Sequence, residues 1–314
     1  MSTGIIANPL SAGGRTGKRW NRLRRALEAK LDGLEIRFTE GAGHATELTR
    51  ELLWRGCDRI VGVGGDGTFN EIANGFFDRG RLIRPDACLG LVPTGTGGDF
   101  QRSLQIPSDP DEAIAVLVRG RPLLIDLGTV TYRAYEGQTR SRYFVNLTSF
   151  GMGGEVSARA KNAFGLFGGK AAFFWATLKT FARYRGKPVD LMLDDWDRPR
   201  RYRVLNVAVG NGSFHGGGMH VCPRARFDDG VLEVTVIDDL SVLTLIKDVR
   251  YLYNGNIYEH PKVRHFRARS IKATSPETTR IEVDGEPVGT LPLEITILPR
   301  ALPVLVAGDS TLAG

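Results

Sequence analysis

Cysteine is scarce in this 314-residue sequence, and the three residues present include no C-x-x-C pair. They are Cys57, Cys88 and Cys222. An odd and dispersed set excludes a disulfide framework, and without paired spacing it offers no thiolate metal site. The cysteine pattern therefore fits a protein of the reducing cytoplasm.

Long hydrophobic runs are also lacking. The longest, residues 171–178, is flanked by Lys170 and Lys179 and is less than half as long as the roughly 20 residues that cross a bilayer. Residues 1–9 lack a charged start followed by a long apolar stretch, so no cleavable signal is expected. We expect a protein that is neither exported nor membrane-spanning.

Several functional signatures are missing as well. No G-x-x-x-x-G-K-[ST] P-loop occurs, and at Gly17-Lys18 the position of the first glycine holds Ala12. His215 and His220 lie in a glycine loop without the H-E-x-x-H spacing of zinc proteases, so we interpret them as cleft or turn residues. The net charge of +7 allows anionic partners, but no zinc or helix-turn-helix signature accompanies it, and we expect no nucleic acid partner.

What is present indicates a two-domain α/β protein. The length and the 42% hydrophobic content are sufficient to bury a core. Up to Gly120, short apolar runs alternate with helical patterns, which predicts a parallel sheet covered by helices, with a ligand at the carboxyl ends of the strands. The expected strands are 4–8, 35–39, 59–63 and 88–92, and the expected helices are 16–31, 44–55, 68–77 and 110–118.

After Gly120 the sequence becomes rich in branched residues separated by turn signals, which is typical of an antiparallel β-sandwich. The expected strands are 204–210, 231–237, 270–274, 279–283 and 293–298, with one helix at 169–184. We therefore divide the chain into an α/β domain at 1–122 and a β-sandwich domain at 123–299. Whether the tail 300–314 returns to the first domain is left open.

The most informative stretch is an apolar strand that breaks into a glycine turn around one carboxylate, Asp66. Gly64, Gly65 and Gly67 let the backbone approach a bound group, and the helix from Thr68 presents its N-terminus to anions. A bare carboxylate repels phosphate, so Asp66 makes sense chiefly if a divalent cation lies between the two. The loop therefore suggests Mg-ATP.

Two other interpretations of this loop stay open. Gly62, Gly64 and Gly67 also have the G-x-G-x-x-G spacing of dinucleotide folds, although the acidic residue further on, Asp86, precedes its strand instead of ending it. Alternatively, the loop is a tight turn in which Asp66 caps the following helix.

Two more strand ends carry polar clusters. The turn 8–14 combines glycines with a hydroxyl suited to phosphate, and a plain turn is the alternative. The loop 93–100 brings a second carboxylate, Asp99, to the same sheet edge as Asp66. Two aspartates that converge on one crevice are more informative than either alone.

A last cluster lies near the C-terminus, where residues 283–286 contain Asp284 and Glu286. Its Asp-Gly pair is also the strongest short hairpin signal. Both a catalytic role and a simple hairpin turn stay open for it.

In their order along the chain, these clusters resemble the diacylglycerol kinase catalytic superfamily, in its soluble bacterial lipid kinase branch, which is similar to the ceramide and sphingosine kinases. The motifs that carry the resemblance are the N-P-x-S-G-like start at 8–12, G-G-D-G-T at 64–68, G-T-x-x-D at 95–99, I-D-L-G at 125–128, Asn211 with G-G-G at 216–218, P-x-A at 223–225 with D-D-G at 228–230, and D-G-E at 284–286. The resemblance implies an N-terminal nucleotide domain of the phosphofructokinase and NAD kinase type, a C-terminal β-sandwich, and ATP in the cleft between them.

The resemblance also implies roles for individual residues. Those that would line the nucleotide are Asn8, Pro9, Leu10, Ser11, Ala12, Thr39, Gly64, Gly65, Asp66, Gly67, Thr68, Asn70 and Thr96. Asp66 and Asp99 would organise magnesium and water around the phosphates. Asp229, with backbone oxygens around Arg226 and Val231, would hold a structural magnesium.

In the second domain, Glu286, supported by Asp284, would act as the base on the lipid hydroxyl. Asp126 lies where a headgroup could be met. One position departs from the family pattern, because G-T-x-N-D has asparagine where this chain has Gly98. Glycine keeps the turn but deletes an amide that could orient a phosphate or a metal-bound water.

The resemblance therefore predicts an ATP-dependent lipid kinase that transfers the γ-phosphate to a hydroxyl of a diacylglycerol-like lipid, a ceramide or a sphingoid base. A soluble-substrate kinase of the NAD kinase type stays open. So does a non-catalytic nucleotide or lipid sensor, which Gly98 motivates. The sequence does not determine the oligomeric state, and a homodimer is left open.

Access to a lipid is expected through residues 159–187, where basic and aromatic residues interleave. Basic residues favour an anionic leaflet and aromatics favour the headgroup region, so we expect peripheral docking at the inner face of the membrane. Packing of the aromatics against the sandwich is the alternative. A second basic stretch, 15–25, is interpreted as a solvated helix face.

Overall fold

A computed structural model describes residues 2–163, 184–194, 196–241, 244, 247–308 and 310–312. It divides into two compact units, Met1–Leu127 with Pro299–Gly314, and Gly128–Leu298. The first unit thus ends at residue 127 rather than 122, and the C-terminal residues belong to it. Nearly all of the helix expected at 169–184 lies outside the described residues, and within them no helix is long and apolar enough to cross a membrane.

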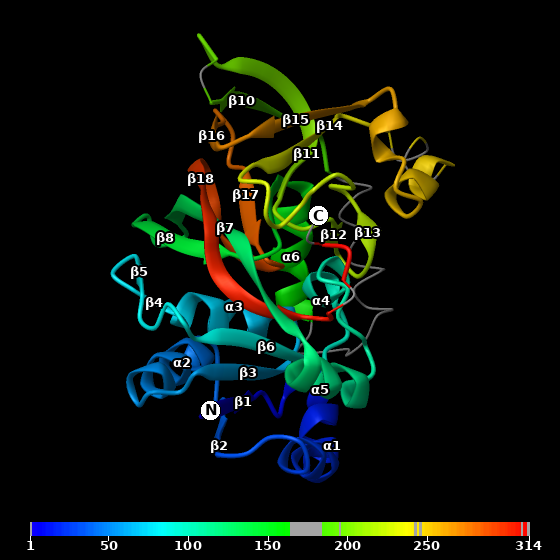
Figure 1. The fold of residues 1–314 in the computed structure, drawn as a ribbon. Coiled ribbons are helices and arrows are strands. Elements are labelled where there is room, and N and C mark those ends of the chain that lie inside the picture. Colours follow the sequence, from blue (N-terminus) through cyan, green and yellow to red (C-terminus); the bar gives the residue numbers. More distant parts are fainter. Residues whose placement is uncertain are drawn as a thin grey trace. The chain divides into compact units, whose positions relative to one another are not determined.

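The sheet of the first unit is parallel and has the strand order β2-β1-β3-β6-β18 (Figure 1). The bounds are β1 (Thr3–Ala7), β2 (Leu34–Phe38), β3 (Arg59–Gly64), β6 (Cys88–Pro93) and the last part of β18 (Glu286–Val306), which meets β6 where Val304 pairs with Leu89. β1, β3 and β6 are buried along their length, as the continuous apolar runs predict. A small hairpin, β4 (Phe77–Asp78) and β5 (Arg81–Leu82), lies apart from this sheet.

Helices follow the strands as the alternation predicts. They are α1 (Ser11–Glu28), α2 (His44–Trp54), α3 (Asp66–Gly75), α4 (Asp99–Ser103) and α5 (Pro110–Arg119). The start of α5 is fixed by a side-chain cap, because the carboxylate of Asp109 accepts the N–H groups of Asp111 and Glu112 at 2.9 and 3.1 Å. Leu27 of α1 and Ile114 of α5 are fully buried in one hydrophobic cluster with the sheet.

The start of α1 differs from the expectation. The helix is assigned from Ser11, but Ala12, Gly13 and Gly14 have φ values of 54°, 67° and 82°, which is a left-handed turn. The regular part of the helix begins only after Gly14, close to the expected Thr16. The turn therefore stands between the end of β1 and the helix proper.

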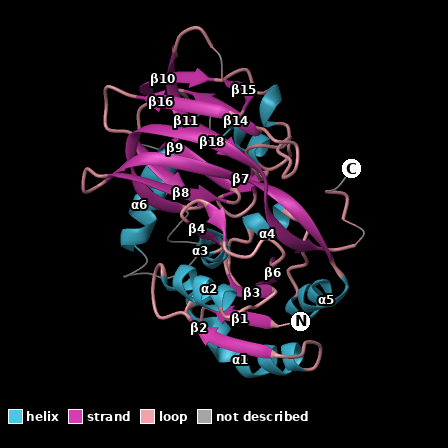
Figure 2. Ribbon diagram, turned by 60° about the vertical axis from the view of Figure 1, so that its left-hand side comes forward, coloured by secondary structure: helices cyan, strands magenta, loops and turns pink. Residues whose placement is uncertain are grey.

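The second unit is built from antiparallel strands (Figure 2). Its elements are β7 (Arg121–Ala134), β8 (Thr139–Phe144), β9 (Leu147–Gly151), α6 (Met152–Ala163), β10 (Lys187–Leu193), β11 (Arg200–Gly210), β12 (Phe214–His215), β13 (Met219–His220), β14 (Leu232–Asp238), η1 (Val249–Leu252), η2 (Ile257–Glu259), β15 (Val263–Ala268), β16 (Ser270–Thr274), β17 (Arg280–Val283) and β18. The order β15-β14-β11-β10-β16-β18 forms one path, and β9 pairs with β11 and β17. β7 and β18 each continue from one unit into the other.

The core of the second unit consists of inward residues from many strands. Phe150, Val207 and Ile295 are fully buried members of one cluster. Alternation along β10 and β16 places every second residue in the interior, which is the expected pattern of a half-buried strand. The β-sandwich prediction is confirmed.

Candidate functional site

Three loops follow β1, β3 and β6 at the carboxyl edge of the first sheet. The register pairs Ala7 with Val63 and Gly64 with Pro93, so the ends of the three strands are neighbours. The N–H groups of Thr94 and Gly95 both donate to the carbonyl of Gly64, at 2.8 and 3.0 Å. The loops that follow β1, β3 and β6 therefore begin side by side, as the sequence predicts.

The second and third loops touch through glycine backbone. A Cβ added to Gly95 would lie 2.6 Å from Cα of Gly65, a distance at which something must shift. Backbone cannot yield as a flexible side chain can, so this approach requires glycine at position 95.

Asp66 binds the backbone of the third loop. Its Oδ2 accepts the N–H of Asp99 and its Oδ1 accepts the N–H of Phe100, both at 3.2 Å. It thus caps α4 rather than its own helix α3, whose N-cap residue Gly65 makes no side-chain cap. The alternative that Asp66 caps the helix following it is therefore wrong, and the carboxylate lies at the edge where the three strands end.

The charge state of Asp66 is relevant to whether this site could bind a divalent cation. Burial raises the pKa of Asp66 above its usual range, the charge of Asp99 raises it further, and the backbone N–H donors oppose both. The carboxylate oxygens of Asp66 and Asp99 are ligands of the kind that magnesium prefers. These two residues therefore fit a divalent cation by their chemistry.

Asp99 has a partner that sequence reasoning did not select. Its Oδ1 accepts Nη1 of Arg102 at 2.9 Å, one turn further along α4. Asp99 is buried while Arg102 is partly exposed. The spacing of these opposite charges, three residues apart on a helix, could have indicated the pair from the sequence.

Gly98, where the family pattern has asparagine, has φ of +71° as the residue before α4. Asparagine is the non-glycine residue that best tolerates this left-handed region. A Cβ at Gly98 would meet only Oε1 of Gln101, at 2.9 Å, the far end of a flexible side chain. The backbone conformation therefore explains why both residue types suit the position.

The first loop is tied to the second by Asn8. Its Nδ2 donates to Oγ1 of Thr68 at 3.1 Å, and its Oδ1 accepts the N–H of Leu10 at 3.0 Å. Ser11 contributes its hydroxyl to the carbonyl of Asn8 at 2.9 Å. Asn8 and Thr68, both predicted nucleotide residues, therefore hold the loops together.

A small hydroxyl cluster connects the first and third loops. Ser11 Oγ lies 2.5 Å from Oγ1 of Thr16, which donates to Oγ1 of Thr94 at 2.8 Å. Thr16 and Thr94 were not selected from the sequence. Thr94 directly follows β6, and this position could have indicated it, whereas Thr16 lies inside α1 and had no such signal.

The remaining predicted nucleotide residues vary in their surroundings. Thr96 is exposed in the third loop, whereas Thr39 is buried after β2, where its N–H donates to Ala7. Asn70 is buried within α3, where its side-chain and backbone oxygens accept Nδ2 of Asn74. The structure thus places Thr39 and Asn70 in internal contacts.

Asp126, the predicted headgroup contact, is fully buried in the first unit. Its Oδ1 accepts the N–H of Arg300 at 2.7 Å, and Arg300 has a left-handed φ of +49°. The carboxylate therefore links β7 to β18 within that unit. This contact accounts for an aspartate at the position without a lipid.

In the second unit, Asp284 and Gly285 form the two-residue turn between β17 and β18, with φ values of +46° and +85°. The hairpin interpretation is correct, because both central residues have the positive φ of a type I′ turn. Three backbone N–H groups also donate to the Asp284 carboxylate, those of Val145, Asn146 and Leu147, at 2.8, 3.0 and 2.8 Å. Burial raises the pKa of Asp284 to about 6 against the lowering effect of these donors.

Glu286 follows this turn and its side chain is 42% exposed. Its Oε2 accepts Nη1 of Arg142, from β8, at 3.1 Å. Asp284 and Glu286 thus stand together as predicted, one fixing a backbone loop and the other open to solvent. Arg142 was missed, because nothing in the sequence relates β8 to the D-G-E motif.

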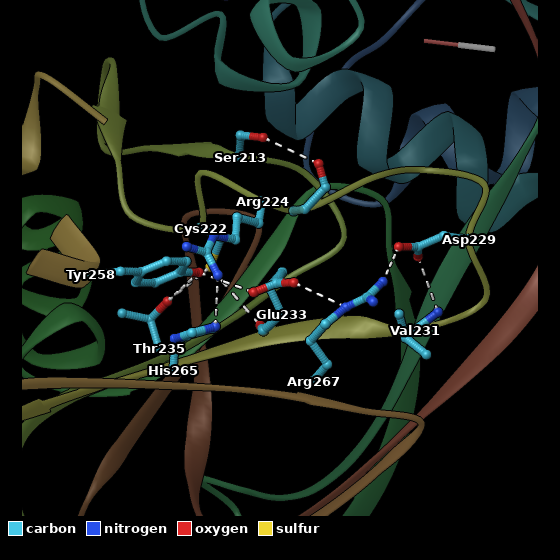
Figure 3. A network of polar contacts seen from close by, with 11 residues as sticks. Ser213, Cys222, Arg224, Asp229, Val231, Glu233, Thr235, Tyr258, His265 and Arg267 are labelled. Carbon is cyan, nitrogen blue, oxygen red and sulfur yellow. Dashed lines mark hydrogen bonds and ion pairs between the residues drawn. The ribbon is translucent and has the colours of Figure 1, made fainter. Parts of the chain in front are cut away.

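Asp229, which was predicted to hold a structural magnesium ion, is bound by a guanidinium group. Figure 3 shows the guanidinium of Arg267 on Oδ2 of Asp229, while Oδ1 accepts the N–H of Val231 at 3.2 Å. Arg267 also reaches Oε1 of Glu233 at 3.2 Å, and Glu233 accepts the hydroxyl of Tyr258 at 3.1 Å. The guanidinium of Arg267 therefore lies beside Asp229, where the resemblance would have a structural magnesium ion.

Within the described residues, no group of three or more His, Cys, Asp or Glu side chains is arranged to hold a metal ion. Near the predicted structural site, Nε of Arg226 lies 3.6 Å from Oδ1 of Asp228.

Two known protein families match this sequence. Residues 2–130 match the diacylglycerol kinase catalytic domain, and residues 146–306 match the YegS C-terminal NAD kinase beta sandwich-like domain. The chain belongs to the diacylglycerol kinase catalytic superfamily. Its two domains occur in the order that this superfamily resemblance predicted, and the kinase class is confirmed at the level of the family, which implies use of ATP.

Individual relatives cover nearly the whole chain. A protein of Pectobacterium atrosepticum named "Probable lipid kinase YegS-like" is 28% identical over 95% of this chain and 93% of its own. A protein of the same name from Pseudomonas syringae pv. syringae is 30% identical over 90% and 86%. "Diacylglycerol kinase" of Staphylococcus saprophyticus is 29% identical over 86% and 84%.

Solved structures confirm the fold. A diacylglycerol kinase from Bacillus anthracis has a TM-score of 0.71 at 22% identity, covering 97% of this chain and 96% of its own. Yeast NADH kinase complexed with NADH has a TM-score of 0.53 at 11% identity, covering 100% and 85%. The expected relation to the NAD kinase fold is thereby confirmed.

Proposed function

We propose that this protein transfers the γ-phosphate of ATP to a hydroxyl group of a lipid. The observation that carries the proposal is the pair of carboxylates, half-buried Asp66 and buried Asp99, at the edge where the glycine loops after β3 and β6 meet. Family membership supports a kinase, and the names of relatives support a lipid as acceptor.

The first unit would bind the polyphosphate. Glycine lets backbone N–H groups approach phosphate oxygens closely, and helix N-termini favour anions. In the first loop, a Cβ at Gly13 or Gly14 would meet nothing within 4 Å. When bound, magnesium would neutralise charge on the transferring phosphoryl group, and Asp66 with Asp99 are the residues that would hold it. Asn8 and Ser11 keep the first loop in place through their bonds to Thr68 and Thr16.

The second unit would handle the acceptor. Phosphoryl transfer has a loose transition state, so alignment of the hydroxyl matters more than early removal of its proton. Glu286 would accept that proton, and Arg142 fixes the orientation of its carboxylate. Asp284 holds the turn by binding three backbone N–H groups.

The acceptor that we favour is diacylglycerol-like, with ceramide and sphingoid lipids as further candidates. The basis is the printed name of relatives such as the Staphylococcus saprophyticus protein. Access to such a lipid would use the basic and aromatic segment 159–187, most of which lies outside the described residues. Of its described ends, Arg159 is bound to Glu155 and Lys187 to the carbonyl of Thr278.

The test is a phosphate-transfer assay with ATP, magnesium and a panel of lipids, in which mass spectrometry identifies the lipid that gains phosphate. We expect one or more lipid alcohols to be phosphorylated. Transfer to NAD alone would favour the NAD kinase alternative, and ATP binding without consumption would favour a sensor. Vesicle sedimentation that is independent of anionic lipid would exclude docking through charge.

A further inference from the structure

Glu282 is a fully buried carboxylate on β17 that the proposed reaction does not use. Its neighbours Ile281 and Val283 are also fully buried. A carboxylate at such a place costs stability unless its oxygens are paired. The partners of Glu282 therefore indicate what the residue does.

One oxygen of Glu282 holds the D-G turn. Oε2 accepts the N–H of Gly285 at 2.6 Å, and Gly285 directly precedes Glu286. The bond fixes the backbone from the inside, while Asp284 fixes it from the other side through the residues 145–147. The turn that carries Glu286 is thus held by two different carboxylates.

The other oxygen of Glu282 faces a histidine. Oε1 lies 3.5 Å from Nε2 of His215, whose side chain is 17% exposed. His215 ends β12, and it pairs with Met219 across a turn of three glycines, Gly216 to Gly218, all with positive φ. Asn146 also joins the glycine hairpin to this region, because its Nδ2 donates to the carbonyl of Phe214 at 2.8 Å.

We propose that Glu282 and His215 are a positioning pair that sets Glu286 by joining the glycine hairpin to the D-G turn. The inference rests on the proposed function only in assigning proton transfer to Glu286. The pair itself touches neither substrate nor the reacting atoms. It acts through the Gly285 N–H on one side and the hairpin backbone on the other.

Kinetics of four proteins test the effect on catalysis: wild type, Glu282→Ala, His215→Asn and the double variant. We expect Glu282→Ala to lower kcat about 10-fold with an unchanged KM for ATP, because misplacing a reacting group by even about 1 Å is costly. His215→Asn should cost less, and nothing further in the Glu282→Ala background, since paired residues are not additive. Fully additive effects, or a kcat of Glu282→Ala within twofold of wild type, would overturn the proposal.

Glu282→Gln separates the hydrogen bond from the charge, since its amide oxygen still accepts the Gly285 N–H. The kcat of Glu282→Gln should be close to that of wild type. Adding His215→Asn to Glu282→Gln should not lower kcat further. If Glu282→Ala does not fold, Glu282→Gln with His215→Asn and their double variant give the same test of coupling.

Hydrogen exchange of the Gly285 amide tests the pairing without reference to activity. We expect Glu282→Ala to accelerate this exchange at least 10-fold and Glu282→Gln to leave it near wild type. Gly137, which donates to Ala134 in another hairpin, is the internal control and should not change. A wild type inactive on every lipid would refute the proposed function alone, whereas unchanged Gly285 exchange in Glu282→Ala would refute this pairing alone.

Discussion

Nη1 of Arg142 donates to Oε2 of Glu286 over 3.1 Å, which joins β8 to the first residue of β18. The arginine side chain is 20% exposed and the glutamate 42%. The pair is therefore partly open, so its carboxylate is accessible while its orientation is restrained. This arrangement suits a group that must meet a hydroxyl from outside the protein.

Glu286→Gln should lower turnover by on the order of 100-fold or more, which is within the range usual for loss of a general base. The amide keeps the size of the side chain and its contact with Arg142 but cannot take a proton. Steady-state kinetics with the lipid found in the transfer assay would measure the change. Near-wild-type turnover would reassign the role to Asp284.

Arg142→Ala should lower kcat by about 10-fold while leaving the affinity for ATP unchanged, since orientation of the reacting group contributes to the rate. Arg140→Ala on the same strand is the matched control, because Arg140 lies on the surface and forms an exposed salt bridge with Glu136 at 3.8 Å. Equal kinetics for the two variants would argue against an orienting role for Arg142.

Asp284 predicts a pH dependence of stability. Because its folded pKa, about 6, lies above the usual value of 3.8, the folded state holds the proton more tightly than the unfolded state does. Its contribution to the free energy of unfolding is present below pH 4 and is lost as the pH rises to about 6, by at most about 3 kcal/mol.

Comparing wild type with Asp284→Asn isolates this contribution from other groups. Urea unfolding at several pH values should show the advantage of wild type shrinking from pH 4 through pH 6 and becoming constant about one pH unit higher. Asn also places an N–H₂ group among three N–H donors, so the variant should be less stable at every pH, by about 1 to 3 kcal/mol. A pH-independent difference would contradict the raised pKa.

Gly95→Ala should weaken ATP binding at least 10-fold. The new methyl group would lie 2.6 Å from Cα of Gly65, so the two loops must separate, and overpacking of this kind costs about 1 to 3 kcal/mol. Gly308→Ala is the control, since a Cβ there meets nothing closer than 4.0 Å. Calorimetric titration with Mg-ATP would compare the two, and equal affinities would remove the loops from the binding site.

Local patterns predicted most of the fold. Ser270–Thr274 forms the strand expected there, and β1, β3, β6 and α5 differ from their expected bounds by a residue or two. These segments are runs with a clear period or a cap, so the local sequence determines them. By contrast, β8 and β15 were not expected, because they are rich in polar residues and are recognised only through their pairing partners.

The candidate site was predictable only as far as single motifs reach. Asp66, Asp99 and Glu286 stand out beside glycines, which mark turns irrespective of the fold. Arg142 and Arg267 do not, because each acts on a carboxylate far away in the sequence. Long-range pairing of this kind depends on strand register, which a single sequence does not reveal.

The single guanidinium of Arg267 forms ion pairs with the carboxylates of both Asp229 and Glu233. Glu233 is buried, and burial raises its pKa while the Tyr258 hydroxyl and Arg267 lower it. Arg267→Ala would leave two carboxylates facing each other, and since the arginine is 52% exposed we expect a loss of about 1 to 3 kcal/mol in unfolding free energy.

The same variant tests which cation the turn prefers. Without the guanidinium, the carboxylates of Asp229 and Glu233 become oxygen ligands for a hard cation. Millimolar magnesium should therefore raise the melting temperature of Arg267→Ala and leave that of the wild type unchanged when ATP is absent. Arg264→Ala, on the same strand as Arg267, removes the pairing with Asp238 and the contact with the Tyr202 ring but leaves Asp229 and Glu233 untouched; it is the matched control and should not respond to magnesium. A wild type stabilised by magnesium as strongly as Arg267→Ala would show that the ion, and not the arginine, neutralises Asp229.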